Sequence, residues 1–104
     1  MFFVYMLKCS DGSYYVGHTD DVEKRLRQHQ KGELLGYTYL RRPVTLVFVQ
    51  SYPSRDEAFQ VERRIKNWSR KKKEALIKGD WNQISVYAKK SFISRALVAI
   101  LPHS

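Results

Sequence analysis

One stretch of the chain, residues 15–29, constrains its fold more than any other segment. It reads YVGHTDDVEKRLRQH, in which a strand pattern stops at Gly17 and an amphipathic helical pattern follows. Asp20 and Glu23 have the spacing of a capping box, so Asp20 is the predicted N-cap residue of that helix. Gly32 is typical of the residue that ends a helix in the left-handed conformation. The stretch therefore predicts, in direct succession, a strand, a turn at Gly17 and a helix.

The inward stripe of this helix carries polar side chains. Val22, Leu26 and His29 recur at the spacing of one helical face, and Arg25 lies on the same side. A structural interpretation is available, because a histidine in the last turn favourably meets the helix dipole and an arginine stem can pack on the core. The functional interpretation is that a fixed positive charge and a proton carrier are held at the edge of the core.

The hydrophobic pattern of the whole chain predicts the element order β-β-α-β-α-α. Apolar, β-branched and aromatic runs favour strands over residues 2–9, 14–17 and 44–52, and the first is apolar enough to be covered on both faces. Helical spacing with capping residues favours helices over residues 20–31, from Ser54 to about Trp68, and 70–78. This order corresponds to a small single-domain α/β sandwich, with a short three-stranded sheet flanked by helices.

Glu62 borders the buried stripe of the second predicted helix. Ser54 and Glu57 form that helix's capping box, and its stripe consists of Ala58, Val61, Ile65 and Trp68. The structural interpretation of Glu62 is an ion pair with Lys66 at i+4, which contributes about 0.2–0.5 kcal/mol. Alternatively, a lone carboxylate at the edge of a basic cleft can bind one hard divalent cation that keeps several waters.

The parity of the first hairpin decides whether Tyr5 and Tyr15 share a face of the sheet, because side chains alternate along a strand. A two-residue turn, Asp11-Gly12, would direct them to opposite faces. A three-residue loop over residues 10–12 would direct both to one face. Gly12 suits the left-handed position that this loop requires, so the sequence predicts the three-residue loop. Both tyrosines are then expected to open toward Arg25 and Glu62.

Composition indicates the class of partner. The 104 residues include 19 lysines and arginines against 10 aspartates and glutamates, a formal net charge of +9. Because these cations are interleaved with tyrosine and tryptophan, nucleic acid is favoured over a membrane as the polyanionic partner. The single cysteine, Cys9, excludes an internal disulfide and leaves no zinc-ligand cluster. Without a signal-peptide pattern or a membrane-length apolar run, the chain is expected to be cytoplasmic.

The order of several short motifs resembles the GIY-YIG nuclease family. These motifs are Val4-Tyr5, then Tyr15-Val16-Gly17, then Arg25, His29 and a helical Glu62. The resemblance is closest to the small, stand-alone bacterial branch, in which a CSDGS-like turn, an RRPV segment and an RKKKEALI-like helix recur. It extends over residues 2–80. The chain differs from the family pattern in lacking the glycine of the first motif and in placing His18 where some members have a lysine.

This resemblance implies an endonuclease that hydrolyses DNA phosphodiester bonds with Mg²⁺ or Mn²⁺ and no small-molecule cofactor. It makes Tyr5 and Tyr15 the paired motif tyrosines and Gly17 the glycine at which the backbone turns close to the site. It also makes Arg25 the phosphate-binding arginine, His29 the proton-handling residue and Glu62 the metal ligand. Either tyrosine could act as the general base.

Further basic residues are candidate phosphate contacts: Arg41, Arg42, Arg63, Arg70, Lys71, Lys72 and Lys73. DNA is the expected partner, with RNA as an alternative. Two other function classes stay open: a module that binds nucleic acid without cleaving it, and an interaction protein that pairs subunits through the C-terminal apolar segment. The predicted nuclease domain covers residues 1–80. Residues 81–104 are expected to be an extension, either a short appended helix or a disordered end.

Overall fold

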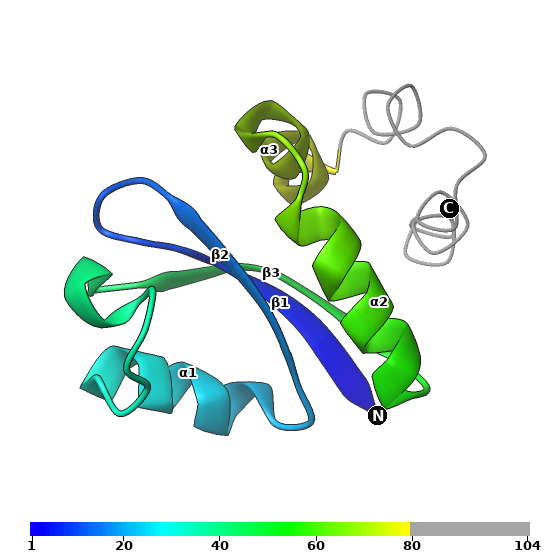
Figure 1. The fold of residues 1–104 in the computed structure, drawn as a ribbon, viewed down its shortest axis with the longest axis horizontal. Helices are drawn as coiled ribbons and strands as arrows, with labels where there is room; N and C mark the ends of the chain where they lie inside the picture. Colours follow the sequence, from blue (N-terminus) through cyan, green and yellow to red (C-terminus); the bar gives the residue numbers. More distant parts are fainter. Residues whose placement is uncertain (80–104) are drawn as a thin grey trace.

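The computed structural model describes residues 1–79, which form a three-stranded antiparallel sheet with helices on both sides (Figure 1). The strands are β1 (Phe2–Lys8), β2 (Tyr14–Thr19) and β3 (Thr45–Tyr52), in the order β2-β1-β3. The helices are α1 (Val22–Lys31), the short 3-10 helix η1 (Tyr39–Arg41), α2 (Arg55–Lys66) and α3 (Arg70–Lys78). The predicted α/β sandwich and its element order are therefore confirmed.

The predicted domain boundary near residue 80 and the predicted C-terminal extension lie outside the described residues. Within residues 1–79, every helix falls short of the length and apolar character that crossing a membrane requires.

The central strand, β1, is buried on both faces, as its apolar sequence predicts. Because side chains alternate along it, Val4 and Met6 join the core that packs against α2 and α3. Tyr5 and Leu7 join a second core, against which Leu26 of α1 packs. Figure 1 accordingly shows α1 and α2 on opposite sides of the sheet. A functional group on β1 or β2 therefore lies on one of two separate faces.

The first hairpin has the predicted three-residue loop. The backbone N–H of Cys9 donates to the carbonyl of Ser13 at 2.8 Å, and Gly12 adopts a left-handed φ of +84°. In the resulting register Tyr5 is opposite Gly17, and Leu7 is opposite Tyr15. Tyr5 and Tyr15 therefore share a face of the sheet, which confirms the parity argument.

The predicted turn at Gly17 is wrong. β2 continues through this residue to Thr19, and Gly17 is paired with β1 as a regular strand residue. It is not among the glycines with positive φ. A glycine inside a strand can instead mark a place where another group approaches the backbone closely, and Gly17 is such a case.

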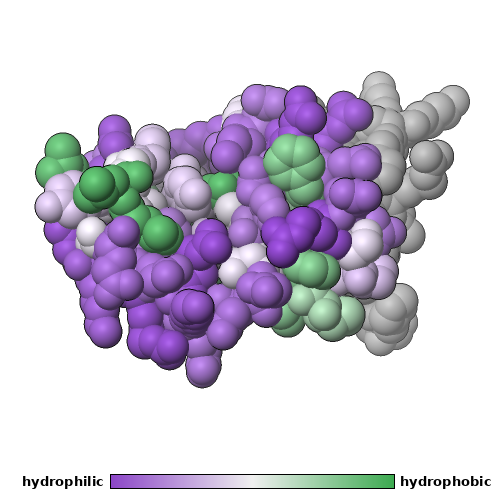
Figure 2. All heavy atoms as spheres, turned by 60° about the horizontal axis from the view of Figure 1, so that its bottom comes forward, coloured by the Kyte–Doolittle hydropathy of each residue, from purple (hydrophilic) through white to green (hydrophobic). Residues whose placement is uncertain are grey.

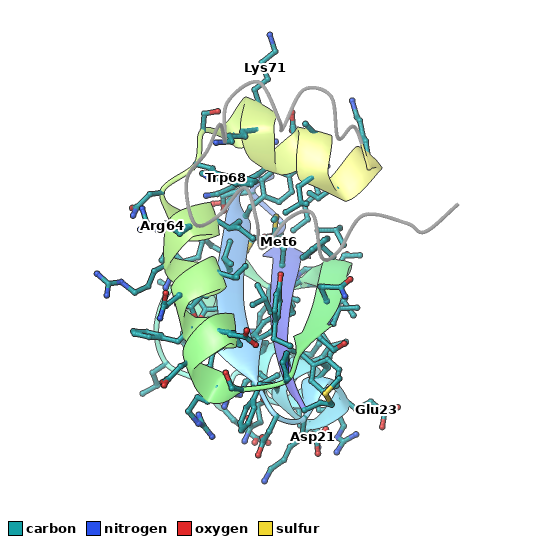
Figure 3. All side chains as sticks on the ribbon, turned by 90° about the vertical axis from the view of Figure 1, so that its right-hand side faces the viewer. Met6, Asp21, Glu23, Arg64, Trp68 and Lys71 are labelled. Atoms are coloured by element: carbon teal, nitrogen blue, oxygen red, sulfur yellow. The ribbon has the colours of Figure 1, made fainter. Side chains whose placement is uncertain are left out.

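The N-cap residue of α1 is Asp21 rather than the predicted Asp20. The carboxylate of Asp21 accepts a hydrogen bond from the backbone N–H of Lys24 at 3.1 Å, the reach expected of an N-cap side chain. Asp20 lies one residue outside the helix, so Glu23 does not complete a capping box with it. Figure 3 shows Asp21 and Glu23 together at the start of the helix. Gly32 ends α1 in the left-handed conformation, as predicted.

The second and third helices follow their predicted signals with one change. Ser54 caps α2, Ser69 caps α3, and Gly79 ends α3 in the left-handed conformation. α2 ends at Lys66, so Trp68 does not belong to its buried stripe as predicted. Trp68 lies between the two helices, where it is partly buried against the same core.

Candidate active site

A chain of hydrogen bonds runs from β1 through His29 to the segment before η1. The Tyr5 hydroxyl lies 2.9 Å from Nε2 of His29, and Nδ1 of His29 lies 2.8 Å from Oγ1 of Thr38. All three residues are buried, each with only 2% of its surface exposed. Partners on both ring nitrogens fix the imidazole, so His29 is more than a histidine that meets the helix dipole.

Burial sets the protonation state of this pair. Burial, and then the charge of Arg25, lower the pKa of His29 below its ordinary value, so the imidazole is neutral near pH 7. Burial, and then Tyr15, raise the pKa of Tyr5, while the Arg25 guanidinium opposes this shift by its charge and as a hydrogen-bond donor. The consistent arrangement has the Tyr5 hydroxyl donating to Nε2 of His29, whose Nδ1–H donates to Thr38.

Gly17 provides the space in which the Tyr5 ring lies. A β-carbon at position 17 would be 2.6 Å from the Tyr5 hydroxyl oxygen and 2.7 Å from the ring carbon that bears it. Both distances are far below van der Waals contact. The glycine is therefore required by the close approach of Tyr5 and not by a backbone turn.

We expect Gly17→Ala to displace the Tyr5 ring and to lower the free energy of unfolding by about 1–3 kcal/mol, the usual range for overpacking. Urea denaturation measures the difference. The matched control is the same substitution in a Tyr5→Leu background, where the phenol is absent and the added methyl group should have little effect. Equal losses in the two backgrounds would show that the Tyr5 ring is not the reason for the glycine.

Tyr15 connects this buried pair to the surface. Its ring lies 6.3 Å from the Tyr5 ring and 5.1 Å from the His29 ring, between centroids. Tyr37 stacks on Tyr15 at 6.1 Å, and the Arg41 guanidinium covers the Tyr37 ring at 3.9 Å. The structure thus brings the two predicted tyrosines together with the predicted histidine and adds an exposed aromatic side chain beside them.

Glu62 comes to the sheet from the opposite face. It is buried on α2, with 8% of its surface exposed, and Oε1 lies 2.7 Å from Nδ1 of His18. His18 and Val16 lie on the α2 face of β2, whereas Tyr15 lies on the α1 face. The expectation that the tyrosines open toward Arg25 and Glu62 on one face therefore needs correction for Glu62, which reaches the site from the other side of β2.

Because β2 is an edge strand, groups from its two faces can meet around that edge. Lys66 lies between the two sides. Its Nζ is 3.3 Å from Oε2 of Glu62 and 5.9 Å from the centroid of the Tyr15 ring. The ion pair of the structural interpretation is thus present, and it is part of a larger cluster that includes His18.

Glu62 is the residue that would hold a divalent cation. No group of three or more His, Cys, Asp or Glu side chains within residues 1–79 is arranged to hold a metal. A cation at Glu62 would therefore keep water molecules and take phosphate oxygens of a substrate, as is usual for Mg²⁺. The carboxylate fits this requirement, because each oxygen makes one contact, with His18 or with Lys66, and keeps a second lone pair.

The basic residues predicted to contact phosphate lie on several parts of the surface. Two of them form ion pairs within the chain, Arg41 with Asp11 at 3.0 Å and Arg70 with Glu74 at 3.2 Å. Three others lie over aromatic rings: Arg42, Arg63 and Lys72. Lys71 projects away from the body in Figure 3, and Lys73 lines a pocket next to Tyr15. Their contacts with nucleic acid stay predictions.

The surface around them is mostly hydrophilic. Figure 2 shows this for one face, on which hydrophobic side chains gather mainly at the end where η1 lies in Figure 1. The segment around η1 includes Leu35 and Leu40, which are 82% and 87% exposed. Tyr37 and Tyr39 of the same segment are also exposed.

The sequence does not identify three residues that contact the predicted site residues: His18, Thr38 and Tyr37. His18 differs from the family motif and carries no other functional signal, although strand parity with Val16 places it on the α2 face. Thr38 carries no signal, because a single threonine in a loop has many structural roles. Tyr37 stood in a segment rich in tyrosine and arginine, and its stacking on Tyr15 depends on the path of that loop.

Comparison with known proteins gives a consistent result. A family model described as the GIY-YIG catalytic domain matches residues 1–75. A UPF0213 protein of Bacillus pumilus is 47% identical over 75 residues, covering 72% of this chain and 76% of that protein. A UPF0213 protein of Staphylococcus aureus is 47% identical over 76 residues, covering 73% and 93%. The solution NMR structure of an E. faecalis protein has a TM-score of 0.52 at 40% identity, covering 73% of this chain and 81% of that one.

Proposed function

The chain belongs to the GIY-YIG catalytic domain family, and from this membership and the geometry of the site we propose that it is a metal-dependent endonuclease acting on DNA phosphodiester bonds. The observation that carries the proposal is the buried pair of the Tyr5 hydroxyl and the neutral His29, held 2.9 Å apart beside Arg25. The phenol, the imidazole and the guanidinium converge at the edge of a core whose other buried members are Leu7, Cys9 and Val44.

Tyr5 is proposed as the general base rather than Tyr15, because the Tyr5 hydroxyl is hydrogen-bonded to His29. An attacking water gives a proton to the Tyr5 oxygen as the Tyr5 proton moves to Nε2 of His29. The imidazole can accept this proton because it is neutral at rest, and Thr38 keeps its Nδ1–H directed away from the reaction. Tyr15 packs against both rings and holds their orientation.

Hydrolysis also requires that the negative charge developing on the phosphoryl group be stabilised. Arg25 supplies a permanent positive charge that can bind two phosphoryl oxygens at once. A divalent cation held by Glu62 would supply Lewis acidity and stabilise the negative charge of the leaving oxygen. His18 and Lys66 orient the Glu62 carboxylate through its two oxygens. Each of the five predicted catalytic residues thus has one proposed role: Tyr5, Tyr15, Arg25, His29 and Glu62.

DNA binding is proposed to depend on the positive surface. The formal net charge of +9 favours a polyanion as the partner. The candidate phosphate contacts are the seven predicted from the sequence: Arg41, Arg42, Arg63, Arg70, Lys71, Lys72 and Lys73. Lys71 is the cleanest of them to test, because it is exposed on α3 and projects away from the body (Figure 3).

We expect affinity for duplex DNA to fall as the salt concentration rises. On a plot of log affinity against log salt, Lys71→Gln should make the slope shallower by about 0.9 if that side chain contacts one phosphate. Fluorescence anisotropy with a labelled duplex in EDTA measures binding without cleavage. A wild-type affinity that does not change between low and physiological salt would remove the electrostatic contribution from the proposal.

Nicking of supercoiled plasmid tests the function. The purified chain should convert supercoiled plasmid to the open circle with Mg²⁺ or Mn²⁺ and should stop when EDTA is added. Salt-dependent binding with no cleavage under either metal would instead identify a binding module on a nuclease fold.

A further inference from the structure

A pocket lies beside the proposed active site, at the edge of the sheet that β2 forms. It has a volume of about 360 Å³ and is lined by Tyr14, Tyr15, Val16, Tyr37, Lys66 and Lys73. This volume is within the usual range for pockets that bind small molecules, roughly 300–1,000 Å³. Its wall is aromatic and apolar on the β2 side and cationic on the side of α2 and α3.

The two lysines of the pocket differ in their contacts. The Lys66 ammonium is paired with Glu62, whereas the Lys73 ammonium makes no hydrogen bond or ion pair with any residue in the part of the chain that the structure describes. Burial, and then the nearby charge of Lys66, lower the pKa of Lys73. Two ammonium groups close enough to repel each other, one of them without a carboxylate partner, make a position that an anion would stabilise.

The pocket wall opposite the two lysines includes the aromatic rings of Tyr15 and Tyr37. Tyr15 and Tyr37 stack on one another, and the Arg41 guanidinium lies over the Tyr37 ring at 3.9 Å. Tyr37 is nevertheless 42% exposed, so its ring is open to a ligand along the rim. Flat apolar surfaces next to cations match the two parts of a nucleotide, its base and its phosphate.

We propose that this pocket binds a single unpaired nucleotide next to the scissile phosphate, with the phosphate on Lys66 and Lys73 and the base against Tyr15 and Tyr37. The inference rests on the proposed function, because it takes the reaction to occur at Tyr5 and Glu62. The pocket adjoins both, through Tyr15 on one side and Lys66 on the other. Perfectly paired duplex cannot fill it, since its bases stay stacked inside the helix. The preferred substrate is therefore DNA with an unpaired nucleotide at the cleavage position.

Fluorescence anisotropy in EDTA tests this with the full chain and two labelled DNAs. One is a perfect duplex, and the other is the same duplex with one unpaired nucleotide. Wild type should bind the second more tightly by about 5-fold, the lower end of the range for one base against an aromatic ring, because Tyr37 is already in contact with Tyr15 and Arg41. Lys73→Gln and, independently, Tyr37→Ala should bring this ratio close to one. Lys71→Gln, the matched control on the same helix, should weaken both DNAs equally.

Equal wild-type affinity for the two DNAs would overturn the proposal, as would a ratio that survives both pocket variants. Thermal unfolding confirms that each variant is folded, and Tyr37→Ala changes an exposed ring without altering charge. Failure of the pocket can be distinguished from failure of the function. Metal-dependent cleavage without a preference in binding would refute the pocket alone, whereas a preference in binding without cleavage would refute the nuclease alone.

Discussion

Replacing Glu62 by glutamine is expected to reduce the single-turnover rate of plasmid nicking by roughly 10³-fold or more, which corresponds to the several kcal/mol that a bound cation contributes to charge stabilisation. Glutamine keeps the size of the side chain and a carbonyl oxygen that can accept from His18, so the fold should be preserved. It removes the negative charge that holds a divalent cation. The rate is measured in saturating Mg²⁺ with protein in excess over DNA.

The matched control is Glu57→Gln, which changes an exposed glutamate in the first turn of the same helix. Its nicking rate should stay within a factor of about two of wild type, as expected for a surface substitution. Circular dichroism and thermal unfolding show whether both variants are folded. Full activity of Glu62→Gln, in a preparation free of contaminating nuclease, would eliminate Glu62 as the metal ligand.

The second large effect is expected for Tyr5→Phe, which should lower the single-turnover rate by about 10²–10⁴-fold, the contribution of a general base. The phenyl ring retains the contacts with Tyr15 and the space over Gly17, so the loss of stability should stay within about 1–3 kcal/mol, the cost of leaving the buried Nε2 of His29 without a donor. What is lost is the hydroxyl that transfers the proton to His29. Rates across pH 6 to 9 distinguish a lost base from lost DNA affinity, which is measured separately in EDTA.

Tyr52→Phe is the control for removal of a buried hydroxyl. Tyr52 belongs to the core under α2, and within residues 1–79 its hydroxyl has no hydrogen-bond partner. Its loss should leave cleavage unchanged. If Tyr5→Phe cleaves at the wild-type rate while Tyr15→Phe does not, the base is Tyr15 and the proton path through His29 is wrong.

The sequence was sufficient for the parts of the site that depend on local geometry. The length of the first loop follows from Gly12, and it alone places Tyr5 and Tyr15 on one face. The spacing of Leu26 and His29 on one helix face likewise places the imidazole in the core. In each case the inference extends over one turn or one pair of strands, where strand or helix periodicity determines the outcome.

The parts that were missed depend on tertiary packing. Asp20 and Asp21 are adjacent and chemically identical, so only the actual path of the chain decides which one caps α1. Gly17 suggests a turn in the sequence, because nothing in the sequence shows that the Tyr5 ring lies over it. The position of Glu62 across β2 from Tyr15 depends on which side of the sheet α2 packs, a choice that helix periodicity does not contain.

Residues on both faces of β2 are proposed to serve one reaction, with Tyr5 and His29 on one side and Glu62 on the other. Single-turnover nicking by wild type, Tyr5→Phe, Glu62→Gln and the double variant tests this directly. Groups that act as a unit are strongly non-additive, so the double variant should be about as slow as the slower single variant. If the two losses multiply instead, the two faces of β2 act independently and the single shared site is contradicted.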